Sequence, residues 1–218
     1  MCTLLPGNAM KTPNPARFWD RRAAEYLKKP VPDAEAYALT LQRVRSHLTP
    51  NASVLELGCG TGTTALHLAA STRQILATDY SAAMIAIGDA RARAEGVSNV
   101  HFRCCTLDDP ELAAGSFDVV MAMNLLHLLD DIPARLGRIR ELIRPGGLFI
   151  SKTPCIGDQG LALRVVIPVL RALGLAPYVN FVTERSLSAD LTNAGFELTE
   201  TGMYPKKTRS YFVVARNA

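Results

Sequence analysis

The chain of 218 residues has few of the features that mark a protein for export or for metal binding. Its five cysteines are an odd number, and they include no CxxC pair and no Cys/His set at zinc-ligand spacing. The N-terminal segment contains no apolar core of signal-peptide length. These absences predict reduced thiols, no bound metal and a cytoplasmic location.

Long hydrophobic runs and a strong charge of one sign are also missing. The longest apolar stretch, at 161–176, is interrupted by two arginines and a proline and falls short of the roughly 20 residues of a membrane-spanning helix. The 24 Lys and Arg residues against 20 Asp and Glu leave a net charge of +4, and the one dense basic cluster is short, at 206–209. The sequence therefore predicts no membrane span and no nucleic-acid partner.

A hydrophobic content of 48% is enough for one domain with a full core. From residue 53 onward, short apolar runs alternate with segments of helical pattern, which is typical of βα units in a parallel sheet. The expected strands are 53–57, 74–78, 100–104, 117–122, 148–151, 196–201 and 209–215. The last two are joined by a short turn at 202–208, so they must pair antiparallel.

Helical patterns fill the remaining segments. Ser81 is placed to cap one helix and Gly96 to end it, and Asp131 and Pro133 fit the first turn of another, which ends before the Pro-Gly-Gly at 145–147. Two further helices are expected after the fifth strand, at 161–175 and about 184–193. Two more, at 16–28 and 33–48, precede the first strand and predict a helical cap, residues 1–52, over a core of residues 53–218.

The most informative segment is 54–62, VLELGCGTG, which joins the first expected strand to a helical run. Its glycines have the spacing G-x-G-x-G, whereas a pyrophosphate site for a dinucleotide has G-x-G-x-x-G. Glycines at such a turn adopt backbone angles that other residues avoid, and they let a ligand approach the backbone. Glu56, two residues before the first glycine, favours an ammonium group and would repel a pyrophosphate. An ordinary strand-to-helix turn is the alternative.

Asp79 closes the second expected strand, at the same edge of the sheet as Glu56. Its two carboxylate oxygens can accept hydrogen bonds from both hydroxyls of a ribose. The alternative is a local role at the start of the next helix, ahead of Ser81, and the two roles are compatible. Acidic residues at two strand ends therefore favour a cofactor that carries both an ammonium group and a ribose.

Four segments resemble the motifs of class I S-adenosylmethionine-dependent methyltransferases of the small-molecule type. VLELGCGTG is similar to the family's first motif and TDYS at 78–81 to the acidic end of its second strand, while SFDVVMAMNLLHLLDD at 116–131 and LIRPGGLFISKTP at 142–154 are similar to its fourth and fifth strand motifs. The resemblance implies a Rossmann-like α/β fold, with a seven-stranded, mostly parallel sheet, an antiparallel last strand and helices on both faces. It also implies S-adenosylmethionine as cofactor and S-adenosylhomocysteine as product.

The resemblance further implies a role for individual residues. The first motif would hold the methionine portion of the cofactor, the second strand end its ribose and adenine, and the residues after the fourth strand its sulfonium. The family commonly has an acidic residue after the third strand to bind adenine, and this chain has Cys105, Thr106 and Leu107 there, with Asp108 as a substitute. The implied cofactor site comprises Glu56, Gly58, Cys59, Gly60, Gly62, Asp79, Tyr80, Met84, Leu107, Asp108, Asn124 and Leu125.

His127 and Tyr26 are the catalytic candidates. His127 follows the fourth strand, and an ordinary histidine pKa of about 6.5 suits a proton acceptor, although it is equally a packed core residue. Tyr26 shares a helical face with Phe18 and Arg22 and would either line the acceptor pocket, contact the sulfonium by a cation–π interaction or pack the cap onto the core.

The helix expected at 161–175 is apolar nearly all round. It would be buried against the sheet, lie in a homodimer interface or form an apolar wall of the acceptor pocket. Three later candidates near the carboxyl edge of the sheet are expected to be structural rather than catalytic: Lys152, Cys155 and Tyr178.

Three functions remain open from the sequence. The first is methyl transfer from S-adenosylmethionine to a small molecule, with an apolar or lipid-like acceptor as one option. The second is methylation of protein or nucleic acid, against which stand the low net charge and the lack of an Asn/Asp-Pro-Pro-aromatic motif after the fourth strand. The third is a non-catalytic nucleotide-cofactor binder or a nicotinamide enzyme.

Overall fold

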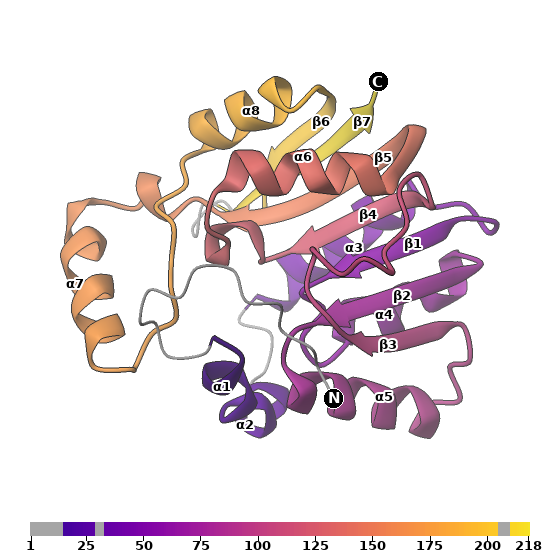
Figure 1. Cartoon of the computed structure of the whole chain (residues 1–218), viewed down its shortest axis with the longest axis horizontal. Coiled ribbons are helices and arrows are strands. Elements are labelled where there is room, and N and C mark those ends of the chain that lie inside the picture. The colour runs from indigo at the N-terminus through magenta and orange to yellow at the C-terminus, as the bar shows by residue number, and fades with distance from the viewer. Residues whose placement is uncertain (1–14, 29–32, 205–209) are drawn as a thin grey trace.

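Seven strands form a single sheet in the computed structural model, which describes residues 15–28, 33–204 and 210–218 (Figure 1). The strand order is β3-β2-β1-β4-β5-β7-β6. Strands β1 to β5 pair in parallel, while β7 is antiparallel to both β5 and β6, so the predicted fold class is confirmed. The strands are β1 (Ser53–Leu57), β2 (Gln74–Asp79), β3 (Val100–Cys104), β4 (Phe117–Met123), β5 (Ile143–Pro154), β6 (Phe196–Met203) and β7 (Ser210–Asn217).

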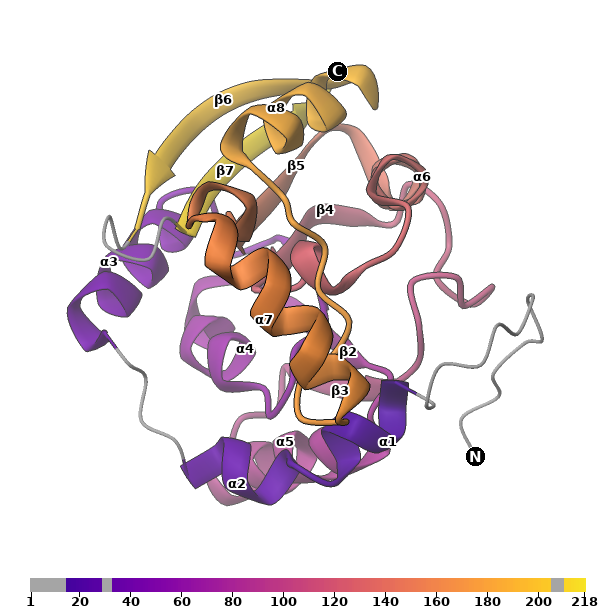
Figure 2. The same cartoon turned by 90° about the vertical axis from the view of Figure 1, so that its left-hand side faces the viewer.

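Helices cover both faces of this sheet, and each face has its own apolar core. One core joins the sheet to α3 and α4, and the other joins it to α6 and α8 (Figures 1 and 2). Ser81 caps α5 by accepting a hydrogen bond from the backbone N–H of Met84, and Asp131 is the N-cap of α6, both as predicted. The helices are α1 (Pro15–Asp20), α2 (Ala23–Lys28), α3 (Ala34–Arg45), α4 (Thr63–Leu68), α5 (Ala82–Ala94), α6 (Ile132–Leu142), α7 (Leu161–Ala172) and α8 (Glu184–Asn193), with 3-10 turns η1 (Ala69–Ser71), η2 (Leu126–Leu128) and η3 (Ile156–Asp158).

The first expected helix, 16–28, is two short helices, so that prediction is wrong in one respect. The chain turns after α1, where the backbone N–H of Arg22 donates to the carbonyl of Trp19. At the same point Asp20 accepts hydrogen bonds from the Ser81 hydroxyl (2.6 Å) and the Ala83 N–H (3.2 Å). The carboxylate thus binds the N-terminus of α5, and α1 and α2 lie beside that helix in both views (Figures 1 and 2).

Strand β5 is longer than the predicted 148–151, because the Pro-Gly-Gly expected to separate helix from strand lies within it. Phe117 of β4 pairs with Ile143, and the next pair is Val119 with Leu148. The residues between Ile143 and Leu148 therefore bulge out of the ladder, which lets a proline lie inside the bounds of a strand.

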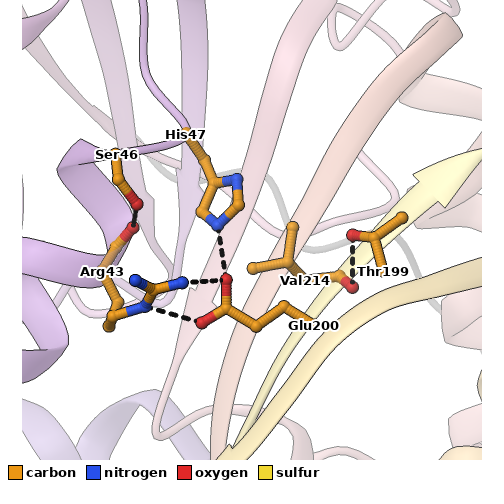
Figure 3. Close-up of polar contacts among 6 residues, drawn as sticks. All are labelled: Arg43, Ser46, His47, Thr199, Glu200 and Val214. Atoms are coloured by element: carbon orange, nitrogen blue, oxygen red, sulfur yellow. Dashed lines mark hydrogen bonds and ion pairs between the residues drawn. The ribbon is translucent and has the colours of Figure 1, made fainter.

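Helix α3 is attached to the far edge of the sheet by a cluster of charged side chains (Figure 3). Arg43 donates two hydrogen bonds to Glu200 of β6, from Nε to Oε1 at 2.7 Å and from Nη2 to Oε2 at 2.5 Å. The Nε2 atom of His47 lies 2.7 Å from the same Oε2. Such a bidentate pair fixes orientation as well as distance. It therefore determines where the earlier turns of α3 lie over the sheet.

Helix α7 projects from the side of the molecule to which the parallel strands point (Figure 1). Of the three alternatives given for this helix, burial against the sheet is wrong, because its apolar side chains are largely exposed, with Val165 at 69% and Leu173, its C-cap residue, at 66%. Among the described residues, no helix has the length and apolar character needed to cross a membrane. The basic cluster at 206–209 lies outside the described residues, as do parts of the predicted cap, 1–14 and 29–32.

Candidate cofactor site and active site

The glycine-rich turn lies where the sequence places it, between β1 and α4. Gly58, Gly60 and Gly62 all have positive φ angles, of 62°, 56° and 76°, which favour glycine at each position. A Cβ atom on Gly58 would lie 2.6 Å from Leu125, and one on Gly62 would lie 2.4 Å from the ring of Phe102. The turn thus needs glycine for its own conformation and packing as well as for the approach of a ligand.

Glu56 is the most unusual group near this turn. Its side chain is 2% exposed, and its Oε2 atom has no hydrogen-bond partner in the described part of the chain. Burial raises the pKa of Glu56 to about 8, and the charge of Asp79 adds to this, while a backbone hydrogen bond from Ala65 acts in the opposite direction. A buried carboxyl oxygen without a partner is costly, and the ammonium group of an amino acid is a group that would satisfy it.

Asp79 connects the end of β2 to the glycine turn. Its Oδ2 accepts a hydrogen bond from the Gly60 N–H at 3.0 Å, and its Oδ1 accepts one from the Ser81 N–H at 2.9 Å. Each carboxylate oxygen has a second lone pair, so both can still accept a ribose hydroxyl. Burial raises the pKa of Asp79, and the charge of Asp20 adds to this, while backbone hydrogen bonds from Ser81, Gly60 and Tyr80 oppose the shift. The local role and the ribose-binding role are therefore compatible in one geometry.

Three other predicted cofactor residues lie beside this acid. Cys59 is buried and donates its N–H to the Thr78 carbonyl at 2.9 Å, and burial raises the pKa of its thiol. Tyr80 follows Asp79, and burial raises the pKa of its hydroxyl to about 12. Met84 is fully buried in the first turn of α5. Tyr80 and Met84 are near Asp79 along the chain, and Cys59 is joined to the same strand end through Thr78.

The predicted substitute for the missing adenine acid has another partner. Asp108 forms an ion pair with Arg135 of α6, with Oδ2 and Nη1 2.6 Å apart. Leu107 is half-buried and packs against the core beneath α6. The carboxylate of Asp108 is thus held toward α6, and its contact with adenine stays a prediction.

The segment after β4 has the backbone strain that is common at functional sites. Asn124 has a φ of 57°, unusual for a residue other than glycine, and its N–H donates to the Lys152 carbonyl at 2.7 Å. Leu125 packs against Gly58, which brings the end of β4 to the glycine turn. Leu125 therefore lies next to the turn, and the place of Asn124 and Leu125 near the sulfonium stays a prediction.

The two catalytic candidates differ in their surroundings. The Nδ1 atom of His127 is buried without a partner among the described residues, and burial lowers the pKa of the ring to about 4. The ring is therefore uncharged at neutral pH and holds a proton weakly. Tyr26 of α2 lies over Gly60, where an added Cβ would be 3.7 Å from its ring, and it is 47% exposed. Burial, Asp79 and Glu56 together raise the pKa of its hydroxyl.

The shared face predicted for the cap helices is only partly present. The guanidinium of Arg22 lies 3.8 Å from the centre of the Phe18 ring, and its Nη2 donates to the Gly174 carbonyl at 3.4 Å. The ring of Tyr26 contacts Trp19 edge to face instead, with centroids 6.2 Å apart. The turn between α1 and α2 separates the two contacts.

A small cavity of about 30 Å³ lies beside Asn124, between α3 and the ends of β4 and β5. It has polar side chains that the sequence did not single out for binding, because a tyrosine and a threonine on an amphipathic helix have no distinctive pattern. No cluster of three or more potential metal ligands occurs among residues 15–28, 33–204 and 210–218. The residues lining the cavity are Tyr37, Thr40, Leu41, Val44, Thr64, Met123, Asn124 and Lys152.

Comparison with known proteins identifies the family. Residues 54–147 match the model of a methyltransferase domain. The chain is 31% identical over 193 residues to a ubiquinone biosynthesis O-methyltransferase of Xanthomonas axonopodis pv. citri (strain 306), covering 84% of this chain and 77% of the relative. It is 27% identical over 205 residues to the protein of the same name from Acinetobacter baumannii (strain ACICU), covering 91% and 85%.

A solved structure supports the same fold. Geranyl diphosphate C-methyltransferase from Streptomyces coelicolor A3(2), in complex with S-adenosyl-L-homocysteine, superposes with a TM-score of 0.68 at 15% identity, covering 84% of this chain and 79% of that one. The motifs, the sheet topology and these relatives agree. The chain belongs to the class I S-adenosylmethionine-dependent methyltransferases, and it is an enzyme that methylates a small molecule with S-adenosylmethionine as cofactor.

Proposed function

We propose that the site at the carboxyl edge of the sheet binds S-adenosylmethionine through Glu56, the 58–62 turn and Asp79, and that the acceptor is a hydroxyl oxygen of a small apolar molecule. The observation that carries the binding site is the buried Oε2 of Glu56, which lacks a partner within the described residues next to a turn of positive-φ glycines. The cofactor supplies a methyl group on a positively charged sulfur whose departure leaves a neutral thioether.

The nature of the acceptor is inferred from two observations. The relatives are named as O-methyltransferases of ubiquinone biosynthesis, which favours an oxygen acceptor. Helix α7 exposes apolar side chains on the side of the molecule where the strands end, including Val165 and Val169. Such side chains suit an apolar acceptor that approaches from α7.

Catalysis would depend mainly on position. Glu56 and Asp79 would fix the two ends of the cofactor, and Asn124 with Leu125 would border the methyl group, so that the acceptor oxygen and the methyl carbon lie in line. A hydroxyl acceptor must also lose its proton. His127 is the proposed acceptor of that proton because it follows Asn124 and Leu125 in the chain and its ring is uncharged at neutral pH. Its pKa of about 4 makes it a weak base. Tyr26 would cover the turn from the α2 side.

Three broader features belong to the same proposal. Residues 1–52 would act as a cap over the core of residues 53–218, supported by the position of Tyr26 over Gly60. The protein would act in the cytoplasm. The apolar face of α7 has two alternative roles: it would form a wall of the acceptor pocket, or it would be covered by a second copy of the chain in a homodimer.

The test is methyl transfer by the full chain from S-adenosylmethionine labelled with deuterium in its methyl group. Catechols and phenols with apolar tails of increasing length are offered beside a mixed peptide library and transfer RNA, and products are identified by mass. We expect label on a phenolic oxygen and none on peptide or RNA. Asp79→Ala should weaken cofactor binding by at least about 10-fold, because two ribose hydrogen bonds to a charged group are lost. Label on RNA or peptide alone would exclude the small-molecule acceptor.

A further inference from the structure

Lys152 is a buried cation for which the described part of the chain supplies no ion-pair partner. It lies near the end of β5 with 8% of its surface exposed. Its Nζ donates to the Thr40 hydroxyl at 3.0 Å, and that hydroxyl donates onward to the Ala36 carbonyl at 2.7 Å. Burial lowers the pKa of Lys152, and Asp33 opposes this shift from a distance. An ammonium group in this position is costly unless a negative group meets it.

The cavity beside Asn124 gives such a group a place to bind. Lys152 lines it together with Tyr37 and Thr64, whose hydroxyl oxygens lie 3.3 Å apart. Its volume of about 30 Å³ is enough for a water molecule or for part of a carboxylate. A pocket of this size, with hydroxyl groups and an ammonium group in its lining, can therefore accept a small oxygen-bearing group but not a ring.

A buried carboxyl group lies near the same two hydroxyls. Glu56 interacts with the backbone N–H of Ala65, the residue that follows Thr64. Burial raises the pKa of Tyr37, and the negative charge of Glu56 contributes, so the Tyr37 hydroxyl lies within the electrostatic influence of that carboxylate. This hydroxyl stays protonated at neutral pH and can donate a hydrogen bond. Hence Tyr37 and Thr64 share a cavity with the Lys152 ammonium group, which has no carboxylate partner among the described residues. They also lie near the Glu56 carboxyl, whose Oε2 has no hydrogen-bond partner among those residues.

An α-amino acid carries the two complementary charges on one carbon atom. We propose that Lys152, assisted by Tyr37, binds the carboxylate of the methionine portion of S-adenosylmethionine while Glu56 binds the ammonium group. This inference rests on the proposed cofactor site and adds two residues to it. One ligand then supplies an ammonium group to the Glu56 carboxyl, which gives up its proton, and a carboxylate to Lys152, for which the described residues provide no ion-pair partner. A water molecule or an oxygen of the acceptor are the competing occupants of the pocket.

The experiment measures binding of two ligands by calorimetry to the full chain. S-adenosylmethionine carries the carboxylate, and decarboxylated S-adenosylmethionine keeps the sulfonium and the amine but lacks it. We expect Lys152→Met to weaken binding of the first by about 10–100-fold, the range for a hydrogen bond to a charged group, and to leave the second unchanged. Tyr37→Phe should show the same selectivity with a smaller loss. Lys28→Met, at an exposed lysine on α2, is the matched control and should change neither affinity.

Thermal unfolding of the ligand-free variants separates binding from folding. Lys152→Met keeps most of the side-chain volume and removes a buried charge, so its melting temperature should equal or exceed that of the unchanged protein. A lower melting temperature with equal losses for both ligands would assign Lys152 to structure through Thr40 and overturn the proposal, as would unchanged affinity for both. If the unchanged protein binds neither ligand, the proposed cofactor site itself is wrong, which is a distinct result.

Discussion

The carboxyl group of Glu56 is held in its protonated form by burial, which raises its pKa to about 8. Binding an ammonium group requires the charged form, because only a carboxylate forms an ion pair. If Glu56 binds the ammonium group as proposed, the cofactor must displace the proton of Glu56 at pH 7. We expect up to one proton to be released for each S-adenosylhomocysteine bound, measured by calorimetry in buffers of different ionisation heats. Glu56→Gln should abolish the release and weaken binding, and release that persists in this variant would place the titrating group elsewhere.

The same residue makes stability depend on pH. The pKa of Glu56 is raised on folding from 4.5 to about 8, so its contribution to stability is full below pH 4.5 and is lost as the pH rises through 8. Glutamine has no charge to bury. We expect the ligand-free Glu56→Gln variant to match the unchanged protein at pH 5 and to exceed it at pH 9 by about 1–3 kcal/mol in the free energy of unfolding, measured by urea denaturation. An equal difference at both pH values would contradict the assignment.

Two glycines with similar backbone angles, one before α4 and one after α5, differ in how much an alanine substitution should destabilise the fold. Gly62 and Gly96 have φ angles of 76° and 67°. A Cβ on Gly62 would lie 2.4 Å from the Phe102 ring, whereas nothing lies within 4 Å of one on Gly96. Gly96→Ala should cost about 1–2 kcal/mol, from backbone strain alone. Gly62→Ala should cost about 1–3 kcal/mol more, because the Phe102 ring must move. If urea denaturation gives the same loss of stability for both variants, Phe102 can move aside at no cost.

Helix α3 depends on its ion pairs with β6, and this gives a second dependence on pH with the opposite sign. The hydrogen bonds and charge of Arg43, with help from His47, hold the pKa of Glu200 below its ordinary 4.5. Stability from this carboxylate is present above pH 4.5 and is lost as the pH falls through the lowered pKa. Glu200→Gln should lower the melting temperature at pH 7 by about 2–4 °C, and the difference should vanish near pH 3. Glu197→Gln, at an exposed position of the same strand, serves as the control.

Elements with a periodic apolar pattern and clear end signals are predictable from this sequence, and those set by distant partners are not. The ends of α8 and of β3 coincide with the prediction because their caps and turns are local. The break between α1 and α2 depends on Asp20 reaching the N-terminus of α5, which no local pattern records. The bulge in β5 depends on pairing with Phe117 and Val119 of β4. Local sequence does not record this pairing, so the Pro-Gly-Gly sequence alone predicts a turn.

The same distinction holds for the candidate site. Glu56, the glycines and Asp79 are identifiable because they lie in one motif and at one strand end, where spacing predicts their positions. Tyr37 and Lys152 come from an N-terminal helix and a late strand, and only packing brings them to one cavity. The sequence also does not predict which of these side chains are buried. The exposure of α7 and the unpaired oxygen of Glu56 are properties of the folded chain.

At the scale of the whole molecule, the N-terminal helices and α7 meet at the edge of the sheet that carries the site. Tyr26 of α2 lies over Gly60, and Arg22 donates to the Gly174 carbonyl after α7. These contacts are few, and short helices with few contacts open more easily than the core. A ligand held beneath Tyr26 would add contacts to α1 and α2, while α8 lies on the opposite face of the sheet and would gain none.

Hydrogen exchange tests whether these helices close on the cofactor. With S-adenosylhomocysteine at about 100 times its dissociation constant, the amides of α1 and α2 should exchange up to about 100-fold more slowly, because opening must then release the ligand. Amides of α8 that exchange by local opening should keep their rates. Tyr26→Ala should remove most of the protection in α2 while leaving protection of the glycine turn, because in the proposed site the turn contacts the cofactor directly. Equal protection of α8 and α2 would mean that the ligand stabilises the chain as a unit and that α1 and α2 do not act as a separate cover.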